Sequence, residues 1–500
     1  MGSTFGGLEI GKRALFAQRS AMTTTGHNIA NANTEGYSRQ VAVMKATTAL
    51  PYPATQNDRQ PGQVGTGVEV TSITRLREKY LDGQYRTNNS EYGFWEGKAN
   101  VLGMIEDVMN EPSDNGLQVT LDRFWQSWQD LTKEPDVLSA REVVLQRALA
   151  VTNTMQQMSE SLQSLQADVG EIMNIKVKDV NSIASQIRDL NDQISMLVPH
   201  GYSPNDLYDQ RDLLVDQLSK LVSVKETPSP NGMVNISIEG TGGESFLLVN
   251  GRQEIGTFDE SFPVKKGEIA ALRAALGTEN EQGDIDRYLG QIDQYATEMA
   301  KEINALHRQG VNLEDLKGNV SYENGHRLPF FIDRDWYEAN LDLFNPPDYA
   351  AISAAGAEMD PKRAGDMIIN PLILRDSNKI AAASKDSQAF GDGSTATAIS
   401  KIKFKPLQGF EDKATLDQFY RYTIAKLGME SQEAQRFMEN SNMARNTVEA
   451  RRQSVSGVSL DEEMANMVKY QHAYNAAARS ISAMDEMLDK LINGTGRVGL

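Results

Sequence analysis

The chain has 500 residues, of which 40% are hydrophobic, and its formal net charge at pH 7 is −18. This length predicts about two to four domains, and the acidic balance argues against nucleic acid or an anionic membrane as the main partner. The chain has no cysteine, which excludes disulfides and thiol chemistry, and its five histidines lack the spacing of a metal site. No apolar run is long enough to span a bilayer.

The beginning of the chain predicts a helix with one narrow apolar stripe. Its large side chains recur at intervals of seven, at Leu8, Leu15, Met22 and Ile29. This spacing is typical of a helix that packs against a single partner helix.

Residues 26–40 read GHNIANANTEGYSRQ and predict the end of this helix. Asn31, Asn33 and Gly36 tolerate left-handed backbone conformations, so we expect a tight turn here. Residues 37–46 then alternate between apolar and polar side chains, which predicts an edge strand or extended segment.

The next stretch, residues 47–95, is rich in proline and glycine and predicts loops and short strands. Helical periodicity is expected from about Tyr92 onward. A later helix has one apolar and aromatic face, formed by Leu121, Phe124, Trp125, Trp128 and Leu131. We interpret this face as core rather than as a platform that stacks carbohydrate or bases.

A single helix is predicted from near Val137 to Leu197, because apolar residues recur there in steps of three and four. At about 1.5 Å per residue it would be roughly 90 Å long. After it, Asp206, Asp209 and Asp212 are spaced by three and could hold a cation. The favoured interpretation is a helix start whose carboxylates suit the helix dipole, with Arg211 paired to one of them.

Strict alternation over residues 234–238 and a second short run at 246–249 predict a β-hairpin. Residues 312–364 differ in composition, with several prolines and aromatics, and predict a short inserted outer subdomain. A helix is expected to start at Thr415 and to be interrupted at Gly428, and a further helix is expected over residues 431–454.

The last helix is predicted over residues 459–492, after a hinge at Ser456 and Gly457. Its apolar stripe is formed by Leu460, Met464, Met467, Tyr474, Ile481 and Leu488. The first helix has more basic than acidic residues and the last helix has the reverse, so we expect the two terminal helices to pair. Pairing would leave Tyr470, Tyr474, Met484 and Leu491 partly uncovered, which favours self-assembly into a ring or helical tube.

These patterns predict a mainly α fold with small β parts. It combines paired, coiled-coil-like terminal helices, an elongated helical-bundle shaft with a β-hairpin or small sheet, and a short inserted subdomain. The expected domains are a terminal assembly domain (1–45 and 457–500), a shaft (46–311 and 366–456) and the insert (312–365).

The segments GHNIANANTEGYSRQ and SGVSLDEEM, residues 26–40 and 456–464, resemble the bacterial flagellar axial proteins of rod, hook and hook-filament junction. Together with the later run YQHAYNAAARSISAMDEML, these segments resemble the sequences of the junction members most. The resemblance marks one set of residues as the motif turn: Asn28, Asn31, Asn33, Gly36, Tyr37 and Arg39.

The resemblance implies a structural adapter that joins hook to filament, outside the cell, after type III export. Its expected partners are other copies of the chain, the flagellar hook protein, the second junction protein and an export chaperone at the C-terminal helix. It implies no catalytic residue, metal or cofactor.

Three alternatives stay open at this point. The first is another axial protein of hook or rod, and the second is a soluble cytoplasmic coiled-coil scaffold. The third is an enzymatic insert, for which the carboxylates are Asp333, Asp335, Asp342, Asp348 and Glu358, although no histidine or motif accompanies them.

Overall fold

The computed structural model describes residues 5–49, 65–114, 116–253, 256–279, 281–318, 320, 325–387, 389–410 and 413–494. Contacts within the chain divide it into two units. Unit 1 consists of Met1–Phe94, Lys176–Glu268 and Glu439–Leu500, and unit 2 of Trp95–Ile175 and Ile269–Met438. Three long helices contribute residues to both units: α2 (Lys79–Met109), α4 (Leu138–Leu197) and α13 (Leu416–Ser456).

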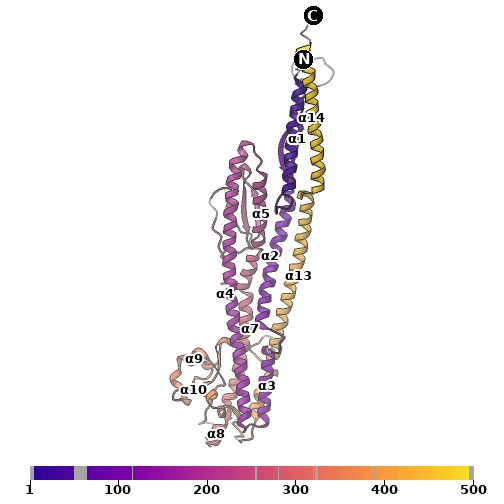
Figure 1. The fold of residues 1–500 in the computed structure, drawn as a ribbon. Coiled ribbons are helices and arrows are strands. Elements are labelled where there is room, and N and C mark those ends of the chain that lie inside the picture. Colours follow the sequence, from indigo (N-terminus) through magenta and orange to yellow (C-terminus); the bar gives the residue numbers. More distant parts are fainter. Residues whose placement is uncertain are drawn as a thin grey trace, which may run out of the picture. The chain divides into compact units, whose positions relative to one another are not determined.

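The predicted fold class is confirmed. The described residues are mainly helical, and the terminal helices α1 (Gly6–Ala30) and α14 (Leu460–Gly494) pack together (Figure 1). The strands form small antiparallel sheets of two or three strands. None of the described helices is long and apolar enough to cross a membrane.

Unit 1 contains two of these sheets. The strand predicted within residues 37–46 is β1 (Gln40–Ala46). It pairs with β2 (Val68–Arg75), from Gln40 with Arg75 to Ala46 with Val68. The second sheet contains β3 (Val224–Pro228), β4 (Val234–Glu239) and β5 (Ser245–Asn250) in that order. The predicted hairpin of β4 and β5 is therefore confirmed, and β3 adds a strand that the sequence did not signal.

Helix α2 begins at Lys79, so the prediction of irregular structure up to about Tyr92 is wrong. The physical reason is that the buried face of this part of α2 is polar, at Asp82, Arg86, Asn89 and Ser90. Asn89 donates from Nδ2 to the carbonyl of Asp216 and to Oγ of Ser219, both at 2.9 Å. These residues lie on α5 (Asn205–Leu221). Because the helix packs through hydrogen bonds, it lacks the apolar period that would reveal it.

Unit 2 has an apolar core built around α3 (Leu117–Lys133). The predicted face of Leu121, Phe124, Trp125, Trp128 and Leu131 is fully buried, so its interpretation as core is confirmed. Phe124 and Trp128 also pack against Phe331 and Phe330, with ring centroids 6.2 and 5.5 Å apart. The aromatics of residues 312–365 thus share this core, and the predicted division into three domains stays a prediction.

The other elements of unit 2 are short apart from α7. Its helices are α6 (Glu268–Leu276), α7 (Asp284–Gln309), α8 (Leu313–Lys317), α9 (Arg334–Ala339), α10 (Tyr349–Ala355), α11 (Pro371–Arg375) and α12 (Ser394–Ser400). Its strands are β6 (Gly277–Thr278), β7 (Glu281–Gln282), β8 (Gly310–Asn312), β9 (Phe331–Asp333), β10 (Met367–Ile369) and β11 (Ala381–Ser384). Burial lowers the pKa of His307 on α7 to about 4, so this imidazole is neutral and structural.

Two of the long helices test specific predictions. Helix α4 runs without a break from Leu138 to Leu197, as predicted. The predicted interruption of α13 at Gly428 is wrong, because the helix is continuous. Gly428 is exposed, and one glycine costs a helix only about 1 kcal/mol, which packing elsewhere on α13 offsets. Thr415 and Gln418 cap the start of α13 reciprocally, at 3.2 and 3.1 Å.

Candidate functional site

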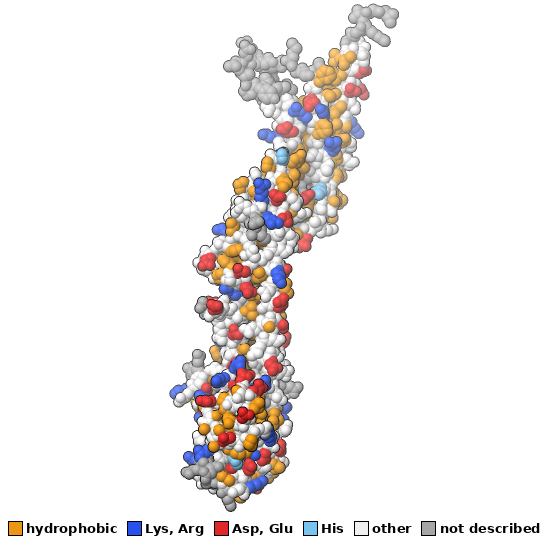
Figure 2. Space-filling view, turned by 90° about the vertical axis from the view of Figure 1, so that its left-hand side faces the viewer, with side chains coloured by type: hydrophobic (Ala, Val, Ile, Leu, Met, Phe, Trp, Pro, Cys, Tyr) orange, Lys and Arg blue, Asp and Glu red, His pale blue; other side chains and the backbone are white. Residues whose placement is uncertain are grey.

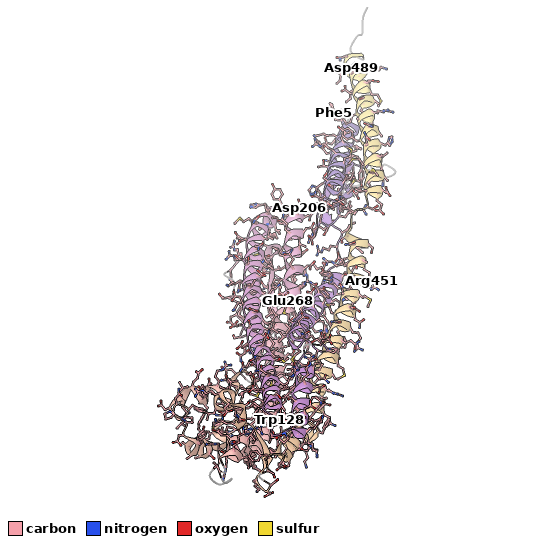
Figure 3. The ribbon with its side chains drawn as sticks, turned by 60° about the horizontal axis from the view of Figure 1, so that its bottom comes forward. Phe5, Trp128, Asp206, Glu268, Arg451 and Asp489 are labelled. Carbon is pink, nitrogen blue, oxygen red and sulfur yellow. The ribbon has the colours of Figure 1, made fainter. Side chains whose placement is uncertain are left out.

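The candidate site is the antiparallel pair of α1 and α14 and the turn at its base, all within unit 1. The two helices approach each other closely at two glycines of α1. A Cβ atom added at Gly7 would lie 2.6 Å from Cε of Met484, and one added at Gly11 would lie 2.5 Å from Cγ1 of Ile481. Figure 3 labels Phe5 and Asp489, which lie toward the same end of this pair.

The buried positions of α1 are mostly small residues. They are Gly11, Ala17, Ala21, Thr24, Thr25 and Asn28. The predicted stripe residues Leu8, Leu15, Met22 and Ile29 are half-buried. Small side chains on one helix leave room for large ones on the other, so the helices interdigitate along this seam.

On α14, the predicted residues fall into two groups. Met467, Tyr474, Ile481 and Leu488 are half-buried. By contrast, Leu460 is 48% exposed and Met464 53% exposed, and Val468, four residues further on, is 51% exposed. We call Leu460, Met464 and Val468 the outward stripe. Figure 2 shows hydrophobic side chains at the surface along the terminal helices.

In the motif turn, Asn28 is 1% exposed and connects three segments. Its Nδ2 donates to the carbonyl of Gln40 at 2.9 Å and to Oε2 of Glu463 on α14 at 3.0 Å. Its Oδ1 accepts from the backbone N–H of Gln40 at 3.0 Å and from the hydroxyl of Tyr37 at 2.7 Å. All the hydrogen-bonding capacity of this amide is therefore used inside unit 1.

Arg39 completes this arrangement, and we name Asn28, Tyr37, Arg39, Gln40 and Glu463 the Asn28 cluster. Arg39 donates from Nε to Oε1 of Glu463 at 2.7 Å, and from Nη1 to Glu462 at 2.7 Å. Glu463 is 2% exposed, and a carboxylate so buried requires these partners. Burial and nearby carboxylates raise the pKa of Tyr37, which keeps its hydroxyl protonated as a donor.

The other residues of the motif turn shape the backbone. Asn31 closes the helix by donating from Nδ2 to the carbonyl of His27 at 3.0 Å. Gly36 has a φ of 78°, in the left-handed region that its lack of a side chain permits. Asn33 is exposed.

A charged network on α5 holds the turn from the other side. Ser38 donates to Asp209 from its backbone N–H at 2.9 Å and from Oγ at 2.7 Å. Gln40 donates to Asp206, at the position labelled in Figure 3, at 2.8 Å. Arg75 donates to both Asp209 and Asp212, at 2.7 and 2.9 Å.

Arginine thus neutralises Asp209 and Asp212, while Asp206 lies 3.3 Å from Nε2 of His27, so the three carboxylates are not arranged around a cation. Burial raises the pKa of Asp212, but attraction by Arg77, Arg75 and Arg86 outweighs it and keeps the pKa below the usual range. The predicted pairing of Arg211 is wrong, since this guanidinium donates to Asn191 and to the carbonyl of Gly232. No group of three or more metal-ligating side chains lies together within the described ranges.

Glu463, Gln40 and Ser38 belong to this site, and the sequence analysis did not select them. Glu463 had one usable signal, because it lies four residues before Met467, in register with the apolar seam of α14. A carboxylate in such a position must have a buried partner. Nothing in the pattern indicated Ser38, because its contact with Asp209 joins segments 171 positions apart.

Family models match three parts of the chain. Residues 8–37 match "Flagella basal body rod protein" and residues 451–494 match "Flagellar basal body rod FlgEFG protein C-terminal". Residues 102–321 match "Flagellar hook-associated protein FlgK helical domain". Over 99% of its length the chain is 35% identical to the flagellar hook-associated protein 1 of Bacillus subtilis, of which 99% is covered.

The chain belongs to the flagellar hook-associated protein 1 family. It is 23% identical to the Escherichia coli member, over 96% of this chain and 98% of that protein. The fold is also similar to a solved structure, the flagellar hook junction protein FlgK from Burkholderia pseudomallei. The TM-score is 0.56 at 13% identity, covering 76% of this chain and 100% of the solved chain.

Membership of the flagellar hook-associated protein 1 family makes the chain a structural component of the bacterial flagellum, at the extracellular hook-filament junction. The predicted family and junction role are confirmed. The comparisons do not support the alternatives, which were a hook protein, a rod protein, an enzyme and a cytoplasmic scaffold. The two rod-type matches cover nearly all of α1, with most of its turn, and all of α14. These are the segments that the Asn28 cluster connects.

Proposed function

We propose that the chain joins hook to filament by assembling head-to-tail through its terminal helix pair. The observation that carries this proposal is the outward stripe, in which three large apolar side chains are each about half exposed on α14. An exposed apolar stripe on a helix is the kind of surface that marks a protein interface.

The proposal assigns a role to each part of the chain. Residues 1–45 and 457–500 form the assembly domain, residues 46–311 and 366–456 form the shaft, and residues 312–365 form an outer subdomain. The residues of the helix pair, from Leu8 to Ile29 and from Leu460 to Leu488, act in pairing or assembly. The motif turn fixes the base of the pair, as the hydrogen bonds of Asn28 support.

The proposed partners are other copies of the chain in a ring or helical array, the hook protein on one side and the second junction protein on the other. Before assembly, the C-terminal helix binds an export chaperone and the chain leaves the cell by the type III route. Binding of a chaperone to this helix would cover the outward stripe, which is exposed in the isolated chain.

Deletion of residues 459–500 tests this proposal. Cells that carry the deleted gene are expected to have hooks without filaments, with filament subunits lost to the medium. Electron microscopy and immunoblotting of the medium measure both effects, and the full-length gene in the same strain is the control. Normal filaments on the deletion strain would contradict the proposed role of the terminal pair.

A further inference from the structure

The chain passes between the terminal helix pair and the rest of unit 1 at two breaks in regular structure. Helix α13 ends at Ser456 and α14 begins at Leu460. Strand β2 ends at Arg75 and α2 begins at Lys79. Short connections of this kind can absorb a change of backbone direction, so the chain path does not by itself fix the direction of the pair.

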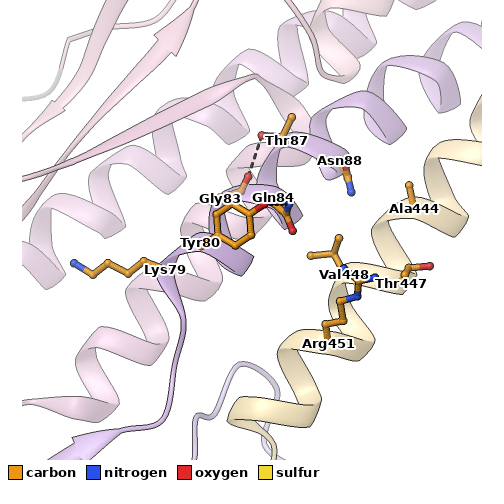
Figure 4. Close-up of a pocket in the computed structure, with 10 residues that line it drawn as sticks. All are labelled: Lys79, Tyr80, Gly83, Gln84, Thr87, Asn88, Ala444, Thr447, Val448 and Arg451. Carbon is orange, nitrogen blue, oxygen red and sulfur yellow. Dashed lines mark hydrogen bonds between the residues drawn. The ribbon is translucent and has the colours of Figure 1, made fainter.

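The ends of α2 and α13 beside these breaks are partly separated. A groove of about 700 Å³ lies between residues 79–88 of α2 and residues 444–451 of α13 (Figure 4). At the break between α13 and α14, the N–H of Arg39 donates to the carbonyl of Ser456 at 2.8 Å. A backbone hydrogen bond at the break can act as a pivot, so contacts away from the break have to set the direction of the pair.

The first two turns of α5 make contacts of this kind. Asp209, which is 5% exposed, accepts hydrogen bonds from the backbone N–H of Ser38 at 2.9 Å and from its Oγ at 2.7 Å. The side chain of Gln40 donates from Nε2 to Asp206 at 2.8 Å and accepts at Oε1 from Nδ2 of Asn205 at 3.1 Å. Three side chains of α5 thus hold the segment where the turn after α1 passes into β1.

The earlier part of the turn also lies against α5. Nε2 of His27, in the last turn of α1, is 3.3 Å from Oδ1 of Asp206. A Cβ atom added at Gly36 would lie 3.1 Å from Cβ of Leu213, so the backbone of the turn packs directly on α5. Contacts at both ends and in the middle of the turn restrict its rotation on α5, which a single contact would allow.

We propose that α5 sets the direction of the terminal pair through these contacts, and we call Ser38, Gln40, Asn205, Asp206 and Asp209 the α5 clamp. The Asn28 cluster holds the two terminal helices together, whereas the α5 clamp orients the closed pair. The consequence of this inference rests on the proposed assembly, because copies that join through their terminal pairs need pairs of one direction. A pair that is already oriented loses less entropy when it joins another copy.

Gln40 shows that the two roles are separable. Asn28 bonds to the backbone carbonyl and N–H of Gln40, whereas the α5 clamp uses its side chain. Asp209 keeps a partner when Ser38 loses its hydroxyl, because Nη1 of Arg75 donates to it at 2.7 Å. Ser38→Ala with Gln40→Ala, which we call the clamp variant, therefore weakens the α5 clamp without leaving a buried carboxylate unpaired.

The distance between two spin labels tests the inference on the purified full-length chain. The natural chain has no cysteine, so Gln217→Cys on α5 and Ser480→Cys on α14, both exposed, provide unique labelling sites. Double electron-electron resonance should give one narrow distance distribution for this α5–α14 label pair. The clamp variant should broaden it, because loss of three hydrogen bonds to α5 raises the population of other directions by roughly 10- to 100-fold.

Two matched controls separate orientation from stability. Asp212→Asn weakens the adjoining arginine network but has no bond to Ser38 or Gln40, so it should leave the α5–α14 distribution narrow. An α1–α14 label pair, Thr23→Cys with Ser480→Cys, reports whether the terminal helices stay closed. Its distribution should stay narrow in the clamp variant.

Four results would overturn the inference. A broad α5–α14 distribution without the clamp substitutions would show that the pair has no fixed direction. An unchanged distribution in the clamp variant, or equal broadening by Asp212→Asn, would remove the role of the α5 clamp. Broadening of the α1–α14 distribution in the clamp variant would show that the same side chains act by closing the pair. All four are read on the isolated chain, so they are distinct from failure of the proposed junction function, which the deletion of residues 459–500 reports.

Discussion

Asn28 donates a hydrogen bond of 3.0 Å to the carboxylate of Glu463, which lies 435 positions later in the chain. Both residues are almost fully buried, and Arg39 donates to the other oxygen of the same carboxylate at 2.7 Å. The beginning and end of the chain are thus joined by polar contacts in addition to the apolar seam. Because each buried polar group has its partner here, loss of one leaves the others unsatisfied.

Asn28→Ala should loosen the terminal pair. It leaves Oε2 of Glu463 and the N–H of Gln40 without the partner that Asn28 supplies, at a cost of about 1–3 kcal/mol. Hydrogen exchange of the α14 amides should therefore accelerate by roughly 5- to 150-fold, since local opening sets the exchange rate. Asn33→Ala, in the same turn but exposed, is the control and should change little. Equal effects of the two variants would contradict the importance of the Asn28 cluster.

Alanine at the glycines of α1 should destabilise the pair in a graded way. Gly11→Ala places Cβ 2.5 Å from Cγ1 of Ile481, which lies close to the backbone of α14, so the helices must separate. Gly7→Ala meets the flexible end of Met484, which can move, and Gly6→Ala meets nothing within 4 Å. We expect a loss of about 1–3 kcal/mol for Gly11→Ala, less for Gly7→Ala and none for Gly6→Ala.

Protease resistance of the purified variants measures this order. Cleavage of the terminal helices should be fastest in Gly11→Ala and unchanged in Gly6→Ala, which serves as the control. A Gly11→Ala protein as resistant as the natural chain would show that the two helices are not packed as closely as the seam implies.

Unit 1 should lose stability in acid through Asp212. Arginines hold the pKa of this carboxyl below its usual range. The ionised carboxylate therefore stabilises unit 1 at pH values above its unfolded-state pKa of about 4, and this stabilisation is lost as the pH falls below that value. Asp212→Asn removes one carboxylate from this buried network, in which Asp209 and Asp216 still pair with the arginines, and should cost about 1–3 kcal/mol near neutral pH.

The pH dependence separates charge from packing at this position. The difference in free energy of unfolding between the natural chain and Asp212→Asn should shrink as the pH falls from 6 to 3, measured by urea unfolding. A difference that stays constant over this range would show that Asp212 acts by shape alone.

Ile481→Asp or Leu488→Asp should abolish assembly while the rest of the chain stays folded. Each places a charge in the half-buried seam of α14, where it lacks a partner and opposes the packing of α1. Filaments should be absent from cells, and the near-ultraviolet spectrum from the aromatic core of unit 2 should be unchanged. Ser480→Asp, exposed on the same helix, is the control. Filaments of normal number on Ile481→Asp cells would contradict the prediction.

Much of the helical architecture could be predicted because it follows apolar periodicity. The 60-residue helix α4 has buried residues at steps of three and four along its length, and only one conformation covers them. The hairpin of β4 and β5 follows equally from the alternation at Val234, Ile236 and Ile238. In both cases a one-dimensional pattern determines which face is buried.

The start of α2 and the charged network could not be predicted in this way. Asp82, Arg86 and Asn89 are typical surface residues by composition, yet each is buried because α5 or α13 supplies its partners. Whether such a residue is buried depends on a contact more than a hundred positions away, which no local pattern records.

The sequence by itself determined that the two terminal helices pair, because an apolar stripe with a period of seven on each helix has to be buried against another helix. It also determined where the turn at residues 26–40 ends the first helix. The tertiary structure decided which residues meet. Gly7 and Gly11 of α1 lie directly against Met484 and Ile481 of α14, since close approach of two helices depends on side-chain volume at both surfaces. It also brought Glu463 to Asn28, because only the folded chain places a buried carboxylate beside its donors.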